Sequence, residues 1–247
     1  MLFLKKERED KKGSFIMNKM KKNELINVKG IIIGIILFLL FYCSSYLQLI
    51  PILLFNIKEI TGSTQVLLSL FSNTILLIIL AIIFRKELIH EWKIFKDKFL
   101  ANFDIGIKYW IIGLIVMMVS NTILTFVLKM GQAANEQEVQ KLISYLPWIM
   151  VINAGIIAPC IEEIVFRKCY KNAFPNKWLF IILSSLVFGS MHVITSMTSP
   201  MDLLFIIPYG SLGASFAMMY QKTNTIYTSI LMHMLHNTIL IILSIIA

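Results

Sequence analysis

The sequence predicts an all-α, polytopic membrane protein, a bundle of about seven transmembrane helices with an eighth as the alternative. Of its 247 residues, 57% are hydrophobic and only 15% are charged, whereas about a quarter of the residues of a soluble protein are charged. The apolar residues also gather in runs of about 20, the length needed to cross a bilayer. This composition excludes an ordinary soluble domain. It also excludes a disordered chain, which has few apolar residues and many charges.

Seven uncharged stretches contain the expected spans. Three lie in the N-terminal half, within residues 30–57, 60–84 and 109–128. A fourth begins at residues 142–161, and three more lie within 178–200, 203–221 and 223–247. Apolar runs such as residues 31–36 do not alternate with polar residues, so helices are expected rather than the strands of a transmembrane barrel.

Lys and Arg residues are concentrated in alternate loops. Of the 23 basic residues, 20 lie in the N-terminal tail, in segments 85–108 and 162–177, and at Lys222. Only Lys58, Lys129 and Lys141 belong to the other side. Because cytoplasmic loops carry the excess of basic residues, we expect a multi-pass protein of the cell membrane with a cytoplasmic N-terminus.

The lipid bilayer is therefore an expected partner, and this loop bias explains most of the net charge of +9. A nucleic-acid partner is not expected, because the basic residues are spread over loops instead of forming a recognisable binding module.

The chain is expected to have three parts. Residues 1–29 form a basic cytoplasmic tail. Residues 30–141 hold three transmembrane helices and a cytoplasmic connector, and residues 142–247 hold four transmembrane helices. In the last part, Gly210, Gly213, Ala214 and Ala217 make two pairs of small residues four apart. Such pairs let helices approach closely, and we expect this packing to lie inside the protein.

The connector, residues 85–108, has an amphipathic pattern. Trp92, Phe95, Phe99 and Phe103 are interspersed with lysines. This pattern is typical of a helix that lies on the inner leaflet with its aromatic side in the bilayer.

Several ionisable residues lie within the expected spans, where burial in the bilayer is costly. Glu162, Glu163 and Arg167 follow the uncharged part of the fourth span, and His192 and His233 lie inside later spans. The first group of turn residues after the glutamates is 172–177, so the fourth helix should continue to about residue 172.

Helix geometry indicates that these groups share a depth. At 1.5 Å per residue, Glu162, His192 and His233 lie roughly 15 to 22 Å from the cytoplasmic ends of their helices, and Asn237 lies roughly 21 Å away. Three separate helices thus place polar groups near mid-membrane. We therefore expect one internal site rather than three unrelated packing positions.

The spacing within each helix suggests chemistry. Glu163 and Arg167 are four residues apart and can pair on one face, which leaves Glu162 free. His233 and Asn237 also share a face, and His236 either joins it or faces a neighbouring helix. A carboxylate with histidines suits the activation of a water molecule, and His and Asn donors suit an oxyanion.

A metal site is the alternative that these residues leave open. Glu162, His192 and His233 would make a three-ligand zinc site with one open position. The His-Glu-x-x-His motif of many zinc proteases is absent. No cofactor is therefore certain, and a divalent metal such as zinc remains a hypothesis.

Three motifs in this order resemble those of a known family. They are Glu162-Glu163-x-x-x-Arg167, Phe188-x-x-x-His192 and His233-x-x-x-Asn237. Together they resemble the CPBP family of intramembrane proteases, which comprises the type II CAAX prenyl endopeptidases and the bacteriocin-processing Abi proteins. The resemblance covers roughly residues 142–247, and the first three spans match only in being hydrophobic helices.

The resemblance implies a catalytic core at 142–247 with a polar intramembrane cavity, which opens to the cytoplasm in the eukaryotic-like members. It implies a membrane-embedded endopeptidase, either a metalloprotease or a glutamate-dependent enzyme. By motif, Glu162 would be the general base and would work with His192 on the water. His233 and Asn237 would hold the oxyanion, and Glu163 and Arg167 would support the site.

The expected partner is a peptide or protein substrate, of the bacteriocin type or CAAX-like. The alternative function is a bacteriocin self-immunity or partner-binding membrane protein without proteolysis. A proton-coupled transporter also uses intramembrane Glu and His, but it is less favoured because the two halves show no repeat.

Overall fold

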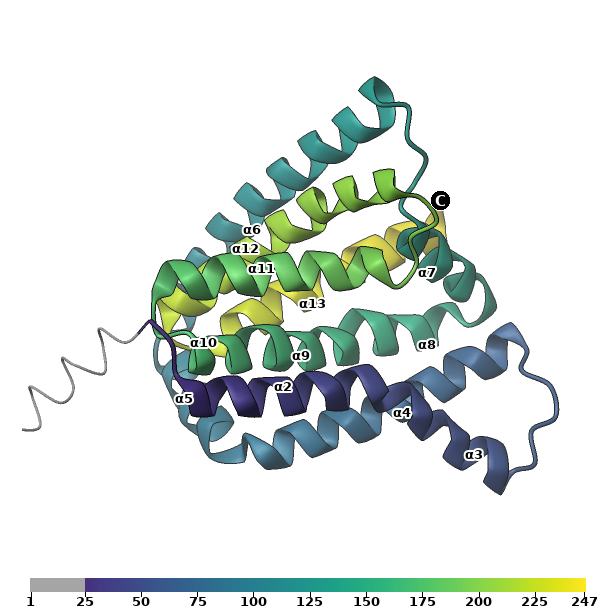
Figure 1. The fold of residues 1–247 in the computed structure, drawn as a ribbon, viewed down its shortest axis with the longest axis horizontal. Helices are drawn as coiled ribbons and strands as arrows, with labels where there is room; N and C mark the ends of the chain where they lie inside the picture. The colour runs from purple at the N-terminus through teal and green to yellow at the C-terminus, as the bar shows by residue number, and fades with distance from the viewer. Residues whose placement is uncertain (1–24) are drawn as a thin grey trace, which may run out of the picture.

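The structure is a computed structural model that describes residues 25–247, and these residues form helices and the turns between them, without β-strands (Figure 1). Among them, seven helices are long and apolar enough to cross a membrane: Val28–Leu54, Gly62–Ile83, Phe99–Val127, Pro147–Ala173, Lys177–Ile194, Pro200–Thr223 and Ile226–Ile246. The predicted all-α membrane bundle is confirmed, with seven candidate spans. Most of the predicted basic tail, residues 1–24 of 1–29, lies outside the described residues.

The N-terminal half consists of three spans, a surface helix and a short helix that leads into the fourth span. The first span comprises α2 (Val28–Tyr42), η1 (Cys43–Gln48) and α3 (Leu49–Leu54). The other elements are α4 (Gly62–Ile83), α5 (Arg85–Asp97), α6 (Phe99–Thr122) with η2 (Ile123–Val127), and α7 (Ala134–Tyr145). Side-chain oxygens of Asn27 and Thr61 accept backbone N–H bonds at the starts of α2 and α4, which satisfies groups that have no partner within the helix.

The fourth span is one continuous helix with two π-helical segments. Its parts are α8 (Pro147–Ile152), η3 (Asn153–Ile157), α9 (Ala158–Glu163), η4 (Ile164–Lys168) and α10 (Cys169–Ala173). The prediction that this helix continues to about residue 172 is confirmed. The π segments lie directly before and after the short α9, which carries Glu162 and Glu163. Single π turns are rare in proteins and are frequent at functional sites.

The last three spans form a tightly packed group. They are α11 (Lys177–Ile194), η5 (Pro200–Phe205) with α12 (Ile206–Thr223), and α13 (Ile226–Ile246). At Gly189 of α11, a Cβ atom would lie 2.9 Å from both the Gly210 nitrogen and the Ile206 carbonyl oxygen of α12. Gly213 of α12 lies in the same way against Phe188. The predicted close packing of small residues inside the protein is confirmed.

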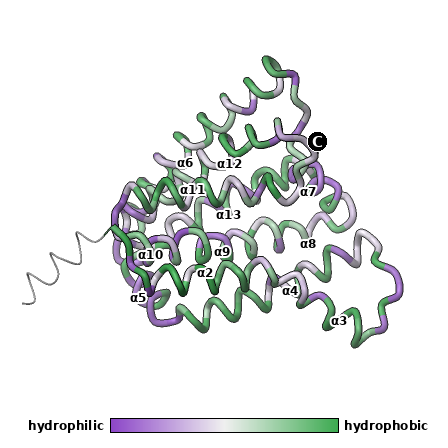
Figure 2. Tube along the Cα trace, viewed as in Figure 1, coloured by the Kyte–Doolittle hydropathy of each residue, from purple (hydrophilic) through white to green (hydrophobic). Residues whose placement is uncertain are grey.

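The bundle has two polar ends and an apolar middle (Figure 2). Helices α5 and α10 lie at one end, and α7 and the C-terminus lie at the other (Figure 1). The basic residues of segments 85–98 and 167–177 belong to the end with α5 and α10. We call these the basic end and the α7 end.

The connector differs from its prediction in two ways. It is not one helix over 85–108, because α5 ends at Asp97 and the third span begins at Phe99, ten residues before the predicted 109. Asp104 and Lys108 had been counted as loop residues, yet they lie in the first turns of α6. Charged side chains at such a position can extend along the helix to the membrane surface.

The aromatic side of α5 also packs on the protein rather than only on lipid. The rings of Trp92 and Phe95 lie 5.0 and 6.0 Å from the ring of Tyr227 in α13. The connector is therefore fixed to the first turn of the last span.

Candidate active site

A partly open cavity of about 390 Å³ lies between α6, α7, the fourth span and α11 to α13. Four of the predicted site residues line it: Glu162 from α9, His192 from α11, and His233 and Asn237 from α13. Three distant parts of the sequence therefore meet at one internal site. Glu163 and Arg167 lie behind this wall and are fully buried.

Glu162 faces the two histidines across a small gap. Its Oε2 atom lies 3.9 Å from Nε2 of His192 and 3.7 Å from Nε2 of His233. These distances are too long for direct hydrogen bonds. They suit a bridging water, which could contact all three groups. The Glu162 side chain keeps 17% of its surface exposed, so it remains accessible from the cavity.

Both histidines are oriented by hydrogen bonds on their far side. Nδ1 of His192 donates to the Phe188 carbonyl oxygen at 2.9 Å, and Nδ1 of His233 donates to Oε1 of Glu163 at 3.0 Å. A carbonyl oxygen or an ionised carboxylate can only accept, so each neutral ring carries its proton on Nδ1. The two Nε2 atoms that face Glu162 are therefore acceptors, and a molecule between these groups must be a donor or a cation.

Aromatic rings hold the imidazoles in place. The His192 ring stacks on Tyr209 with 4.9 Å between ring centres, and the His233 ring stacks on Phe216 at 4.6 Å. Phe188 packs against both histidines. These contacts limit the rotation of both rings, so the Nε2 atoms keep their direction toward Glu162.

Glu163 and Arg167 form the predicted i, i+4 pair, with 3.3 Å between Oε2 and Nε and no exposed surface on either side chain. Arg167 also donates from Nη1 to the Ser184 hydroxyl at 2.8 Å, and its guanidinium lies 4.5 Å from the centre of the Phe188 ring. Together with the bond from His233 to Glu163, the pair connects the fourth span to α11 and α13. A buried charge that loses its partner is strongly destabilising, so both members are needed.

Asn237 and His236 add hydrogen-bonding groups to the cavity wall. Nδ2 of Asn237 donates to the Ala154 carbonyl of η3 at 3.0 Å, which leaves one N–H of this amide free. Nδ1 of His236 accepts from Nε1 of Trp110 at 3.4 Å, so its other nitrogen carries the proton. The sequence left the direction of His236 open, and the structure places it on the same cavity wall.

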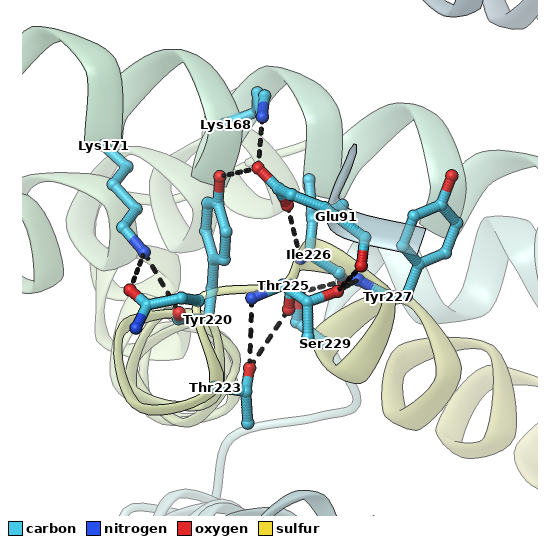
Figure 3. A network of polar contacts seen from close by, with 10 residues as sticks. Glu91, Lys168, Lys171, Tyr220, Thr223, Thr225, Ile226, Tyr227 and Ser229 are labelled. Carbon is cyan, nitrogen blue, oxygen red and sulfur yellow. Dashed lines mark hydrogen bonds and ion pairs between the residues drawn. The ribbon is translucent and has the colours of Figure 1, made fainter. Parts of the chain in front are cut away.

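Sequence reasoning missed a second buried carboxylate, Glu91 of α5 (Figure 3). It accepts bonds from the Lys168 ammonium, from the Tyr220 hydroxyl at 2.9 Å and from the Ile226 backbone N–H at 2.7 Å. The Thr225 hydroxyl donates to the Glu91 carbonyl oxygen at 3.0 Å. Glu91 thus fixes α5 to the start of α13.

The sequence did contain a signal for this role. Glu91 lies three residues after Leu88 and four before Phe95. These spacings place it on the apolar face of an amphipathic helix, where an unpaired charge would be costly.

The predicted metal ligands have donor atoms of a suitable chemical type. Carboxylate oxygen and bare imidazole nitrogen are the donors that zinc prefers. Within residues 25–247, however, no group of three or more His, Cys, Asp or Glu side chains is arranged to hold a metal ion. A metal therefore remains a hypothesis. If one binds, Glu162, His192 and His233 are the residues that would hold it, and it would supply Lewis-acid activation of the water.

Comparisons with known proteins agree with the order of the motifs. Residues 144–239 match the family model "Type II CAAX prenyl endopeptidase Rce1-like", and this range contains all six predicted site residues. "Putative membrane peptidase YdiL" of Bacillus subtilis strain 168 is 30% identical over 142 residues, which cover 56% of this chain and 54% of that protein.

Two further relatives are similar over comparable lengths. An "Uncharacterized protein" of Mycoplasma capricolum is 30% identical over 165 residues, which cover 61% of this chain and 46% of the relative. "UPF0177 protein YxdF" of Lactococcus lactis is 24% identical over 149 residues, which cover 58% of this chain and 80% of the relative.

The chain spans about half the length of the first two relatives. No solved structure matches it significantly. The resemblance predicted from the three motifs is confirmed for the C-terminal part of the chain, where residues 144–239 match the model of Rce1-like type II CAAX prenyl endopeptidases.

Proposed function

We propose that the protein is an intramembrane endopeptidase that hydrolyses a peptide bond with a water activated by Glu162. The observation that carries this proposal is the convergence of one carboxylate oxygen and two oriented imidazole nitrogens on a cavity inside a membrane bundle. The Rce1-like match and the printed name of the Bacillus relative support it.

In the proposed mechanism, a water bridges Glu162, His192 and His233. It donates its protons toward the acceptors that face it, and Glu162 removes one proton as the water oxygen attacks the peptide carbonyl. The same carboxyl group then returns the proton to the leaving amine nitrogen. The two histidines orient the water, because their Nε2 atoms are held toward Glu162 by the bonds on Nδ1.

The oxyanion of the tetrahedral intermediate needs donors on the cavity wall. We propose His233 and Asn237 for this role, as the sequence motif implies. Asn237 has an N–H beyond the one bonded to Ala154. His233 becomes a donor when the proton taken from the water passes from Glu162 to its Nε2, 3.7 Å away, before it is returned to the leaving amine. His236 supplies a further N–H on the same wall.

We also propose that the basic end faces the cytoplasm. The described basic segments lie together at this end (Figure 1), as the positive-inside rule requires. The N-terminus of the first span would then be cytoplasmic, and α7 and the C-terminus would lie on the outer side.

The test uses the Glu162→Gln and His192→Ala variants in membranes, with a reporter set of bacteriocin-type and CAAX-like peptides as substrates. Both variants should lose cleavage while their thermal unfolding remains unchanged. Glu138→Gln is the control, because Glu138 is exposed on α7 and is not part of the cavity wall. Cleavage by a folded Glu162→Gln protein would contradict the assignment. Bacteriocin protection that persists in this variant would instead support the immunity alternative.

A further inference from the structure

The cavity has a direction within the bundle. From Glu162 it extends to α7 and to the first turns of α12 and the last turns of α13. The residues that line this outer part are Asn135, Glu136, Gln140, Pro208, Tyr209, Leu240 and Ser244. Among the described residues, none from α5 or α10 takes part in the lining. The cavity therefore extends toward the α7 end, away from the basic end (Figure 1).

Packed side chains separate Glu162 from the basic end. Phe166 and Phe180 are at most 1% exposed. The buried Glu163–Arg167 pair lies in the same helix as Phe166. Lys168, the next residue after Arg167, bonds to the buried Glu91 of α5 (Figure 3). Because protein interiors are close-packed, a peptide cannot reach Glu162 from this side without displacing these side chains.

The charged residues in the outer part of the cavity wall are acidic and not basic. Glu136 of α7 is the one acidic residue in this outer part, and the described lining contains no Lys, Arg or Asp. Deeper in the cavity, Glu162 is the other acidic residue. A cavity with acidic groups and no basic side chain attracts a cationic segment and disfavours an acidic one.

Tyr209 connects this outer part to the catalytic groups. Its ring stacks on His192, and Tyr209 lines the cavity together with Asn135 and Glu136. A ligand held at Glu136 would therefore lie next to the ring that supports His192.

We propose that the substrate enters from the α7 end and that Glu136 selects a basic group on it, either a Lys or Arg side chain or a free amino terminus. This rests on the proposed function and adds a substrate class and a side of entry. With the basic end cytoplasmic, the peptide reaches the site from the outer side of the membrane.

The charge test compares Glu136→Lys with Glu138→Lys. Both residues are exposed on α7, but only Glu136 lines the cavity. Each variant is assayed with two peptides that differ only in a Lys or a Glu near the cleaved bond.

Wild type should prefer the Lys peptide, and Glu136→Lys should reverse the preference through KM, with kcat unchanged. Glu136→Gln should reduce the preference about two- to fivefold, the strength of an exposed ion pair. Equal effects of the two Lys variants, or no effect of either, would overturn the role of Glu136.

The access test compares Gln140→Cys, on the cavity wall, with Gln137→Cys on the same helix, whose native side chain instead donates to the Gln132 carbonyl. Lys86→Cys marks the basic end. A membrane-impermeant maleimide is added to intact cells and to inverted vesicles, and labelling of the parent protein is subtracted.

Gln140→Cys should be labelled from the opposite side to Lys86→Cys. A bulky label attached to Gln140→Cys should block peptide cleavage, whereas the same label attached to Gln137→Cys should not. Labelling of 140 and 86 from the same side would overturn the side of entry. The proposed function is tested independently of the side of entry: it would be wrong if the Glu162→Gln variant still cleaved the peptide.

Discussion

Two carboxylates in this bundle, Glu91 and Glu162, have opposite surroundings. Both oxygens of Glu91 accept hydrogen bonds, from Lys168 and Tyr220 on one and from the Ile226 backbone on the other (Figure 3). Among the described residues, Glu162 has no such donor, and its nearest polar neighbours are imidazole nitrogens at 3.7 and 3.9 Å. Glu91 is closed within the protein, whereas Glu162 faces a cavity.

This difference distinguishes a carboxylate that holds helices together from one that is available for catalysis. A buried acid whose oxygens are all used stabilises one arrangement of helices and has no capacity for a ligand. An acid that faces imidazole nitrogen acceptors across a gap still has oxygen lone pairs with which it can bind a water or a substrate. The same residue type therefore holds the connector in place at 91 and is available for reaction at 162.

Exchange of each acid for its amide should produce opposite results. Glu162→Gln should lower kcat by about 10² to 10⁴ because it removes the general base, and the apparent unfolding temperature in detergent should not fall. Glu91→Gln should lower stability by about 3 to 5 kcal/mol because it leaves the buried Lys168 charge without its partner, with kcat per folded molecule retained.

Kinetics and thermal unfolding on the same preparations measure both effects. Glu87→Gln is the control for Glu91, because Glu87 is exposed on the same helix. If Glu91→Gln reduced kcat as much as Glu162→Gln did, the separation of roles would be wrong.

The Glu163–Arg167 pair is a buried ion pair within one helix, whereas the Glu91–Lys168 pair joins two helices. Either Glu163→Gln or Arg167→Met alone should destabilise the protein by about 3 to 5 kcal/mol, since each leaves an uncompensated buried charge. The double variant Glu163→Met, Arg167→Met should cost less than the sum of the single changes. A double-mutant cycle on unfolding midpoints measures this coupling, and strict additivity would show that the two side chains do not act as a pair.

The smallest effect is expected from packing rather than charge. Gly189→Ala should cost about 1 to 3 kcal/mol, because its Cβ would meet α12 backbone atoms that cannot rotate away. Gly131→Ala is the matched control, since a Cβ there has no atom within 4 Å, and it should change stability by less than about 0.5 kcal/mol. Equal unfolding midpoints for the two variants would show that α11 and α12 can separate without cost.

The sequence predicted the spans and the meeting of Glu162, His192 and His233, because depth along a helix follows from its rise per residue. It did not predict Glu91, whose partners lie 77 to 135 residues away and depend on which helices pack together. It misplaced the start of the third span, because Asp104 and Lys108 are charged and yet helical. The direction in which the cavity extends could not be predicted from the sequence either, because it depends on where α7 lies in the fold.

The two π segments around α9 have a consequence for how such proteins can differ in length. A π turn holds one residue more than an α turn. Loss of one residue within 153–157 or 164–168 could be absorbed by conversion to ordinary helix without turning the flanking residues to another face, whereas the same loss in a regular α-helix would rotate everything beyond it by about 100°. In alignments of relatives, single-residue gaps in the fourth span should therefore fall inside these segments. A relative with such a gap should still present its glutamate at the position of Glu162 toward α11 and α13, as Glu162 does here.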